Sequence, residues 1–180
     1  MGKQKIVTFT GASGAGKDTL ARSLGFPYII STTTRPPRAT DCPGEYEHVS
    51  HNQFSWLALC DEFAWHQEFA GEWYGTKLEY LTAAQIAKHP SVMILIPERV
   101  KTLRELIPAD LITSFYIVSP DVAALRDRLE KRGDRPEKIE QRLREREWDE
   151  EAKLSDIPYI FIHNTGTIDE AVAEVRKYLK

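Results

Sequence analysis

The first residues that could do chemistry form a glycine-rich segment near the start of the chain. It reads Gly11-Ala-Ser-Gly14-Ala-Gly16-Lys17, after an apolar run typical of a strand and before a stretch typical of a helix. Glycines let the backbone wrap an anion closely, and the helix N-terminus favours negative charge there. Lys17 can reach the β- and γ-phosphates of a nucleotide. The segment predicts a phosphate-binding loop, with a turn that binds nothing as the alternative.

The residues after Lys17 depart from the usual pattern of such a loop. Ser or Thr is expected directly after the lysine as a Mg²⁺ ligand, and this chain has Asp18 followed by Thr19. The hydroxyl of Thr19 can supply the missing ligand, or Asp18 can hold the metal through water. Asp18 is equally well explained as a first-turn acid, which the helix dipole favours. The residue pattern leaves these readings open.

Composition limits the class of protein. A chain of 180 residues with 42% hydrophobic and 28% charged residues is typical of one globular domain. A net charge of −3 gives no general attraction to nucleic acid or anionic membranes, so we expect neither partner. No apolar run approaches the roughly 20 residues of a transmembrane helix. Without a signal-peptide core or metal-type cysteine spacing, we expect a cytoplasmic protein.

Strands and helices alternate along most of the sequence. Apolar and β-branched runs predict strands at 5–10, 28–31, 92–96, 113–118 and 159–162. Helices are expected at 17–24, 79–89 and 98–107, from 119 to the interruption at 133–136, from there to about 154, and after the capping box at 167–170. The alternation predicts an α/β protein with a three-layer fold and about five parallel strands.

Residues 32–80 break this alternation. Prolines and a glycine interrupt them between positions 36 and 44, a capping box at 50–53 predicts a helix to about 60, and 62–74 favours a hairpin. We expect a single domain over 1–180, with a core formed by 1–31 and 81–180. Residues 32–80 would be an insertion, and about 133–137 a short lid.

The chain resembles the guanylate kinase family. The likeness lies in Ser31-Thr-Thr-Thr-Arg35-Pro-Pro-Arg38, in Gly44–Ser50, in Gly71-Glu-Trp-Tyr74-Gly75-Thr76 and in Arg128-Leu-Glu-Lys-Arg132-Gly133, and it continues at Arg142-Leu143 and Asn164. It covers nearly the whole chain. The resemblance implies a P-loop kinase that uses ATP and Mg²⁺ to phosphorylate a small acceptor already carrying a phosphate.

The resemblance also implies roles for the matching positions. The ATP site would comprise Gly11, Ser13, Gly14, Ala15, Gly16, Lys17, Asp18 and Thr19, with Asn164 near the adenine and Asp18 or Thr19 at the metal. The acceptor site would comprise Ser31, Arg35, Arg38, Tyr46, Trp65, Tyr74 and Thr76. Lys17, Arg128, Arg132 and Arg142 would be catalytic, because arginine forks match phosphate and a loose transition state needs its charge stabilised. Taken singly, the arginines are also explained as solvated charges.

The acceptor-reading positions depart from the family. An acid that accepts hydrogen bonds from guanine is replaced by Trp65, which offers one donor and no acceptor. Gln67 shares the face of Trp65 in a strand, and Glu68 faces the other way. A second acid, expected after 92–96, is missing, although Glu98 lies nearby. Loss of such partners weakens discrimination for guanine.

Three readings of the function therefore stay open. The acceptor can be a GMP-like nucleotide. It can also be ribose 1,5-bisphosphate, since the phosphokinase branch for that sugar is similar at Gly16-Lys17-Asp18 and carries an arginine near Arg99, which would bind a second phosphate. A non-enzymatic protein-binding module is the third reading, which the intact loop disfavours. The oligomeric state is left open.

Overall fold

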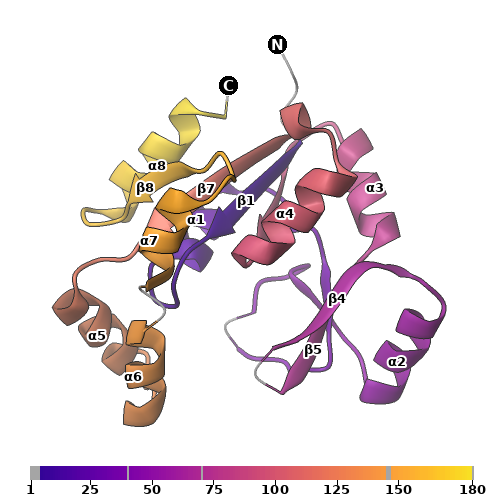
Figure 1. Cartoon of the computed structure of the whole chain (residues 1–180), viewed down its shortest axis with the longest axis horizontal. Coiled ribbons are helices and arrows are strands. Elements are labelled where there is room, and N and C mark those ends of the chain that lie inside the picture. The colour runs from indigo at the N-terminus through magenta and orange to yellow at the C-terminus, as the bar shows by residue number, and fades with distance from the viewer. Residues whose placement is uncertain (1–4, 40, 70, 145–146, 180) are drawn as a thin grey trace.

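The central sheet of the protein is parallel, with strands in the order β6-β1-β7-β8. A computed structural model describes residues 5–39, 41–69, 71–144 and 147–179. The strands are β1 (Ile6–Thr10), β6 (Ser91–Ile94), β7 (Ile112–Val118) and β8 (Ile160–His163). The α/β fold class expected from the alternating pattern is confirmed, and Figure 1 shows helices on both faces of this sheet.

The strand expected at 28–31 is reduced to a single bridge. Tyr28 pairs in parallel with Val92, and Ile29 donates to the Val92 carbonyl. The chain then leaves the central sheet, because Thr32 and Thr33 pair with a strand of a second sheet. In the described part of the chain, the central sheet therefore has four strands and one bridge instead of about five strands.

Two apolar clusters hold the layers together. On one face, α1 (Lys17–Leu24) and α8 (Ile168–Lys177) pack with residues such as Phe9 and Phe115. On the other face, α3 (Leu78–Ile86) and α4 (Pro97–Leu106) cover Ile6 and Met93. Burial on both faces explains why β1 is apolar or β-branched throughout, as parallel strands usually are. A short 3₁₀ turn, η1 (Ala109–Leu111), precedes β7.

Residues 31–77 build a second sheet, in the order β3-β2-β5-β4. Its strands are β2 (Ser31–Thr33), β3 (Tyr46–His48), β4 (Phe63–Phe69) and β5 (Glu72–Lys77), and α2 (His51–Leu59) packs beside them. The hairpin and the capping box at the start of α2 are confirmed. Strand β3 was not expected from the sequence, because three residues are too few to show a period.

Two short helices, α5 (Val122–Lys131) and α6 (Pro136–Arg144), lie at the segment expected as a lid at about 133–137, and we refer to them and the turn between them as the lid region. The charged segment expected to be helical to about residue 154 is helical in both of its described parts, α6 and α7 (Glu147–Leu154), and residues 145–146 lie outside the described residues. Ile139 of α6 is buried with Leu125 and Leu129 of α5. Asp149 of α7 instead accepts hydrogen bonds from Tyr116 and Ser119 of the core. The two parts of this segment therefore contact different elements of the protein.

The lid and the second sheet extend from the same side of the core. In Figure 1, α5 and α6 lie below it on one side, and β4, β5 and α2 lie below it on the other. The loop between β1 and α1 lies between these two arms. Among the helices of the described residues, none is long and apolar enough to cross a membrane.

Candidate active site

The glycines of the loop between β1 and α1 are required by its shape. Gly11, Gly14 and Gly16 have φ values of 141°, 85° and 105°, a region that L side chains rarely adopt. A Cβ at Gly11 would lie 2.4 Å from the backbone oxygen of Ile117, and one at Gly16 would lie 2.2 Å from Nδ2 of Asn164. The loop therefore lies against β7 and Asn164 with no room for side chains, which is the shape that a phosphate-binding backbone needs.

Three side chains fix this loop from around it. Nζ of Lys17 donates to the carbonyl oxygens of Gly11 and Ala12, each at 2.8 Å. Nδ2 of Asn164 donates to the carbonyl of Ala15 at 2.9 Å, and Asn164 is buried. Arg128 donates to the backbone oxygens of Gly14 at 3.4 Å and Asn164 at 3.1 Å. Asn164, which the family resemblance places near adenine, thus packs directly against the loop.

The two metal candidates lie at the start of α1. Asp18 and Thr19 are exposed in its first turn, directly after Lys17. No group of three or more His, Cys, Asp or Glu side chains suited to a metal occurs among the residues that the structure describes. Mg²⁺ bound with a nucleotide needs only one or two protein ligands, because phosphates and water supply the others. The residues present therefore fit a metal that arrives with a triphosphate.

A pocket of about 240 Å³ lies between the second sheet and the end of β6. It brings together four of the predicted acceptor residues that carry hydroxyl groups: Ser31, Tyr46, Tyr74 and Thr76. The indole of Trp65, which is 8% exposed, forms part of the wall next to Met93 and Leu95. The structure thus brings five of the seven predicted acceptor residues to one cavity.

A bulge in β4 decides which of its side chains reach the pocket. Phe63 pairs with Lys77 and Trp65 pairs with Thr76, so two residues of β4 advance against one of β5. After this bulge, Trp65 and Gln67 face the pocket, and His66 lies on the opposite side with Phe54 and Trp73. Glu68 is exposed and does not line the pocket.

Gln67 and Arg99 meet at the wall of the pocket. Nε of Arg99 donates to Oε1 of Gln67 at 2.6 Å, and both residues line the cavity. Glu98, the other candidate of this segment, is exposed and does not line it. Where the family resemblance leads one to expect carboxylates, the pocket presents an indole, an amide and a guanidinium.

The two arginines of the Arg35-Pro-Pro-Arg38 turn are placed differently. Arg35 is 5% exposed, stacks on the ring of Tyr46 at 4.7 Å and donates to Asp41 at 2.8 Å. Burial acts to raise the pKa of Asp41, but the hydrogen bonds from Arg35 and from the backbone of Arg38 outweigh it and hold that pKa below its usual value. The side chain of Arg38 is exposed. Arg35 thus packs against the ring of Tyr46 from outside the pocket. Neither Arg35 nor Arg38 lines the pocket.

Glu45 is a pocket residue that the sequence reasoning missed. It is 7% exposed, lines the cavity beside Tyr46 and accepts a hydrogen bond from the Cys42 backbone at 2.9 Å. Burial raises its pKa, and the charge of Asp18 raises it further. The residue before Tyr46 belongs to no helical or alternating pattern of the sequence, so only the fold shows that the side chain of Glu45 lies at the pocket.

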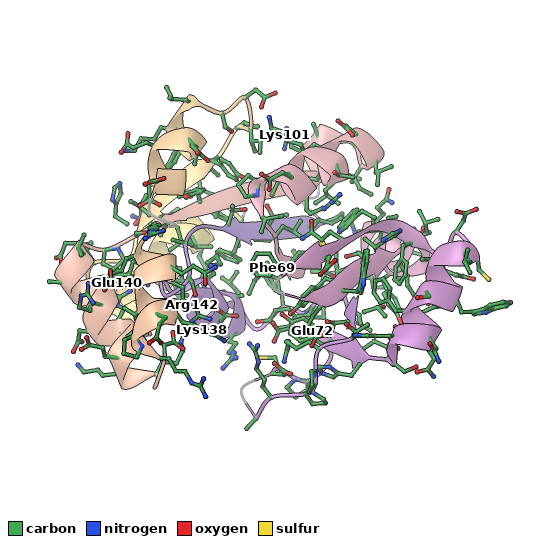
Figure 2. All side chains as sticks on the ribbon, turned by 60° about the horizontal axis from the view of Figure 1, so that its bottom comes forward. Phe69, Glu72, Lys101, Lys138, Glu140 and Arg142 are labelled. Atoms are coloured by element: carbon green, nitrogen blue, oxygen red, sulfur yellow. The ribbon has the colours of Figure 1, made fainter. Side chains whose placement is uncertain are left out.

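The lid carries the remaining predicted arginines. Arg132, the C-cap of α5, reaches toward Ser13 of the loop with Nη2 at 3.4 Å from its Oγ. Figure 2 shows Arg142 and Lys138 on the side of α6 turned toward the β4–β5 hairpin, where Phe69 and Glu72 lie, with Glu140 pointing elsewhere. Glu140 pairs with Arg126 of α5 at 2.8 Å. The lid therefore presents its predicted clamp to the space beside the loop.

Comparison with known proteins shows the family to which the chain belongs. The family model described as guanylate kinase matches residues 3–180. A guanylate kinase of Symbiobacterium thermophilum is 33% identical over 97% of this chain and 83% of its own length, and one of Thermus thermophilus is 32% identical over 94% and 78%. The crystal structure of a guanylate kinase from Anaplasma phagocytophilum has the same fold, with a TM-score of 0.72 at 20% identity, covering 99% of this chain and 86% of that one. The chain belongs to the guanylate kinase family.

Proposed function

We propose that the protein transfers the γ-phosphoryl group of ATP to the phosphate of a small acceptor bound in the pocket of β4, β5 and β6. One observation carries this proposal: the glycine loop and the pocket adjoin each other. The backbone N–H of Leu95, which lines the pocket, donates to the carbonyl of Phe9 at 3.0 Å, and Phe9 lies two residues before Gly11 of the loop. A donor on the loop and an acceptor in the pocket would therefore meet.

The loop is the proposed donor site. Backbone N–H groups of 11–17 would surround the phosphates, and Lys17 lies over the loop, where its ammonium can contact them. Mg²⁺, held through Asp18 or Thr19, would supply charge neutralisation on the triphosphate. Arg128, Arg132 and Arg142 would stabilise the charge of the phosphoryl group in transfer, and closure of α5 and α6 would exclude water that could hydrolyse ATP.

The hydroxyl groups of the pocket are the proposed acceptor site. Burial raises the pKa of Tyr46, so its phenol keeps its proton and can donate a hydrogen bond to a phosphate oxygen. Tyr74, Ser31 and Thr76 add further hydroxyls on the same wall. An acceptor phosphate is already an anion, so the reaction needs no general base, and we assign that role to no residue.

GMP is the first acceptor to consider. The relatives that cover most of this chain at about a third identity are guanylate kinases, and that supports a purine nucleotide in the pocket. Trp65 can stack on a base, and the amide of Gln67 can hydrogen-bond with its edge.

Ribose 1,5-bisphosphate is the second candidate, and one observation favours it. Arg99 brings a guanidinium to the pocket wall, held by Gln67 at 2.6 Å, and no carboxylate from β4 accompanies it among the described residues. A guanidinium there suits a second phosphate, because its planar donors match phosphate oxygens.

The test compares acceptors side by side. ATP consumption is measured with GMP, other nucleoside monophosphates and ribose 1,5-bisphosphate, for the wild type, Arg99→Ala and the control Arg104→Ala, which lies on α4 away from the pocket lining. If the sugar is the acceptor, Arg99→Ala raises its KM about ten- to hundredfold, the equivalent of about 1.5–3 kcal/mol. Turnover of GMP unaffected by Arg99→Ala would assign the nucleotide instead. Lys17→Ala is the inactive control, and a wild type that neither binds ATP nor turns over any acceptor would contradict the kinase proposal.

A further inference from the structure

Asp134 lies between two arginines of the lid. Arg132 donates to Oδ2 of Asp134 from Nε at 3.2 Å and also from Nη2, and Arg142 donates to the same oxygen from Nη1. The two arginines come from different helices, α5 and α6, and the carboxylate comes from the turn between them. One carboxylate oxygen thus contacts both Arg132 and Arg142, two of the three lid arginines predicted to be catalytic.

The backbone of this turn fixes where the carboxylate lies. The N–H of Gly133 donates to the carbonyl of Glu130 at 2.8 Å, and the N–H of Asp134 donates to that of Leu129 at 3.2 Å. Gly133 has a φ of 83°, which favours glycine, and α6 begins at Pro136. The side chain of Asp134 is 15% exposed, less than that of Arg142 at 25% or Arg132 at 46%. The acid is therefore the most enclosed and most constrained member of the three.

We propose that Asp134 is a positioning residue that assembles the phosphoryl clamp before the phosphate arrives. The proposal rests on the proposed function, in which Arg132 and Arg142 contact the transferring group. Two guanidinium groups repel each other, and a carboxylate between them removes that repulsion. Nη2 of Arg132 is also 3.4 Å from Oγ of Ser13, so the assembled pair already lies beside the loop. An arriving γ-phosphoryl group meets donors whose orientation is set, which is how fixed dipoles lower a barrier.

A competing reading of the same geometry has the opposite consequence. If the carboxylate occupied the place of the phosphate, it would have to be displaced by ATP, and its removal would strengthen binding. The positioning role predicts that removal of the carboxylate reduces the binding affinity contributed by the γ-phosphate. Kinetics and binding of one isosteric variant, Asp134→Asn, therefore separate the two.

The experiment uses four full-length proteins: wild type, Asp134→Asn, Asp134→Glu and the control Asp127→Asn. Asp127 lies on α5 and pairs with Lys131 at 2.8 Å, so the control removes an equivalent charge that does not contact the clamp. Steady-state turnover is measured with saturating ATP and the acceptor of the wild type. Dissociation constants are measured for ADP and for the non-hydrolysable ATP analogue AMP-PNP, and thermal unfolding checks that each protein is folded.

For Asp134→Asn we expect kcat to fall about ten- to a hundredfold, as small misplacements of catalytic groups do, with the acceptor KM changed less than about twofold. The preference for AMP-PNP over ADP should shrink, Asp134→Glu should recover part of both properties, and Asp127→Asn should behave as the wild type. Tighter AMP-PNP binding with unchanged kcat in Asp134→Asn would overturn the proposal in favour of competition, and unchanged values throughout would overturn it in favour of a surface ion pair. A wild type without turnover would refute the proposed function alone, since the comparison of AMP-PNP with ADP still tests Asp134.

Discussion

Replacing Gly16 by alanine tests whether the shape of the glycine loop is what binds phosphate. Gly16 is the N-cap of α1 and has a φ of 105°. A Cβ there would lie 2.2 Å from Nδ2 of Asn164, the atom that donates to the carbonyl of Ala15. The substitution therefore imposes backbone strain and also displaces a buried hydrogen bond that fixes the loop.

The size of the effect follows from these two contributions. A left-handed conformation costs an L residue about 1–2 kcal/mol. Leaving the Ala15 carbonyl or the Asn164 amide without its partner costs about 1–3 kcal/mol more, because Asn164 is buried. We expect Gly16→Ala to lower the free energy of unfolding by about 2–5 kcal/mol and to weaken ATP binding strongly.

The assay combines urea unfolding with calorimetric titration of ATP, and Gly25→Ala is the matched control. Gly25 ends the same helix with a φ of 72°, but a Cβ there would meet nothing within 4 Å. The control should lose only the strain of about 1–2 kcal/mol and bind ATP normally.

A double-mutant cycle with Asn164→Ala isolates the steric part. Without the Asn164 amide, the Gly16→Ala change should cost only the backbone strain, so the two changes should not add. Unaltered ATP affinity in a folded Gly16→Ala protein would refute the reasoning, and additive losses in the cycle would show that Asn164 and the loop are not coupled.

Two further predictions concern the acceptor side. Arg38→Ala should raise the half-saturating concentration of the acceptor more than that of ATP, because the family resemblance implies that Arg38 binds the phosphate of the acceptor. Equal effects in steady-state kinetics would contradict this assignment. Glu47 has a lowered pKa, since hydrogen bonds from Lys77 and Thr32 outweigh the effect of burial. Its stabilisation is therefore present above its usual pKa of about 4.3 and is lost as pH falls through the lower folded-state value. The stability difference between wild type and Glu47→Gln in urea unfolding should shrink below about pH 4, and a constant difference from pH 7 to pH 3 would argue against the ion pair.

Local sequence was sufficient for the position of the glycine-rich loop and for the starts of α2 and α8. The glycines and Lys17 indicate the loop from the sequence alone, because a phosphate-binding backbone needs left-handed or side-chain-free positions at fixed spacing. Both expected capping boxes, at Ser50 and at Thr167, are formed. In each case the interacting groups lie within a few residues of each other, so the chain encodes them without help from the rest of the fold.

Contacts between distant segments could not be deduced in this way. The pairing of Gln67 with Arg99 spans 32 residues, and the inward turn of Glu45 follows from the pairing of β2 with β3. The bulge between Phe63 and Trp65 decides which face of β4 reaches the pocket, and no local pattern announces it. The contact of α7 with the core depends on the hydrogen bond from Tyr116 of β7 to Asp149, which spans 33 residues.

The sequence by itself determined the α/β class, the glycine-rich loop and the family, because these depend on periodicity and on short motifs. The tertiary structure alone decided what the pocket of β4, β5 and β6 presents and how the arginines of α5 and α6 are held. Asp134 shows the difference most clearly: in sequence it is one acid among many in a charged segment. Arg132 is a near neighbour of Asp134 in sequence, but only the packing of α6 against α5 brings Arg142 to the same oxygen, because that packing is driven by apolar side chains and not by the charges themselves.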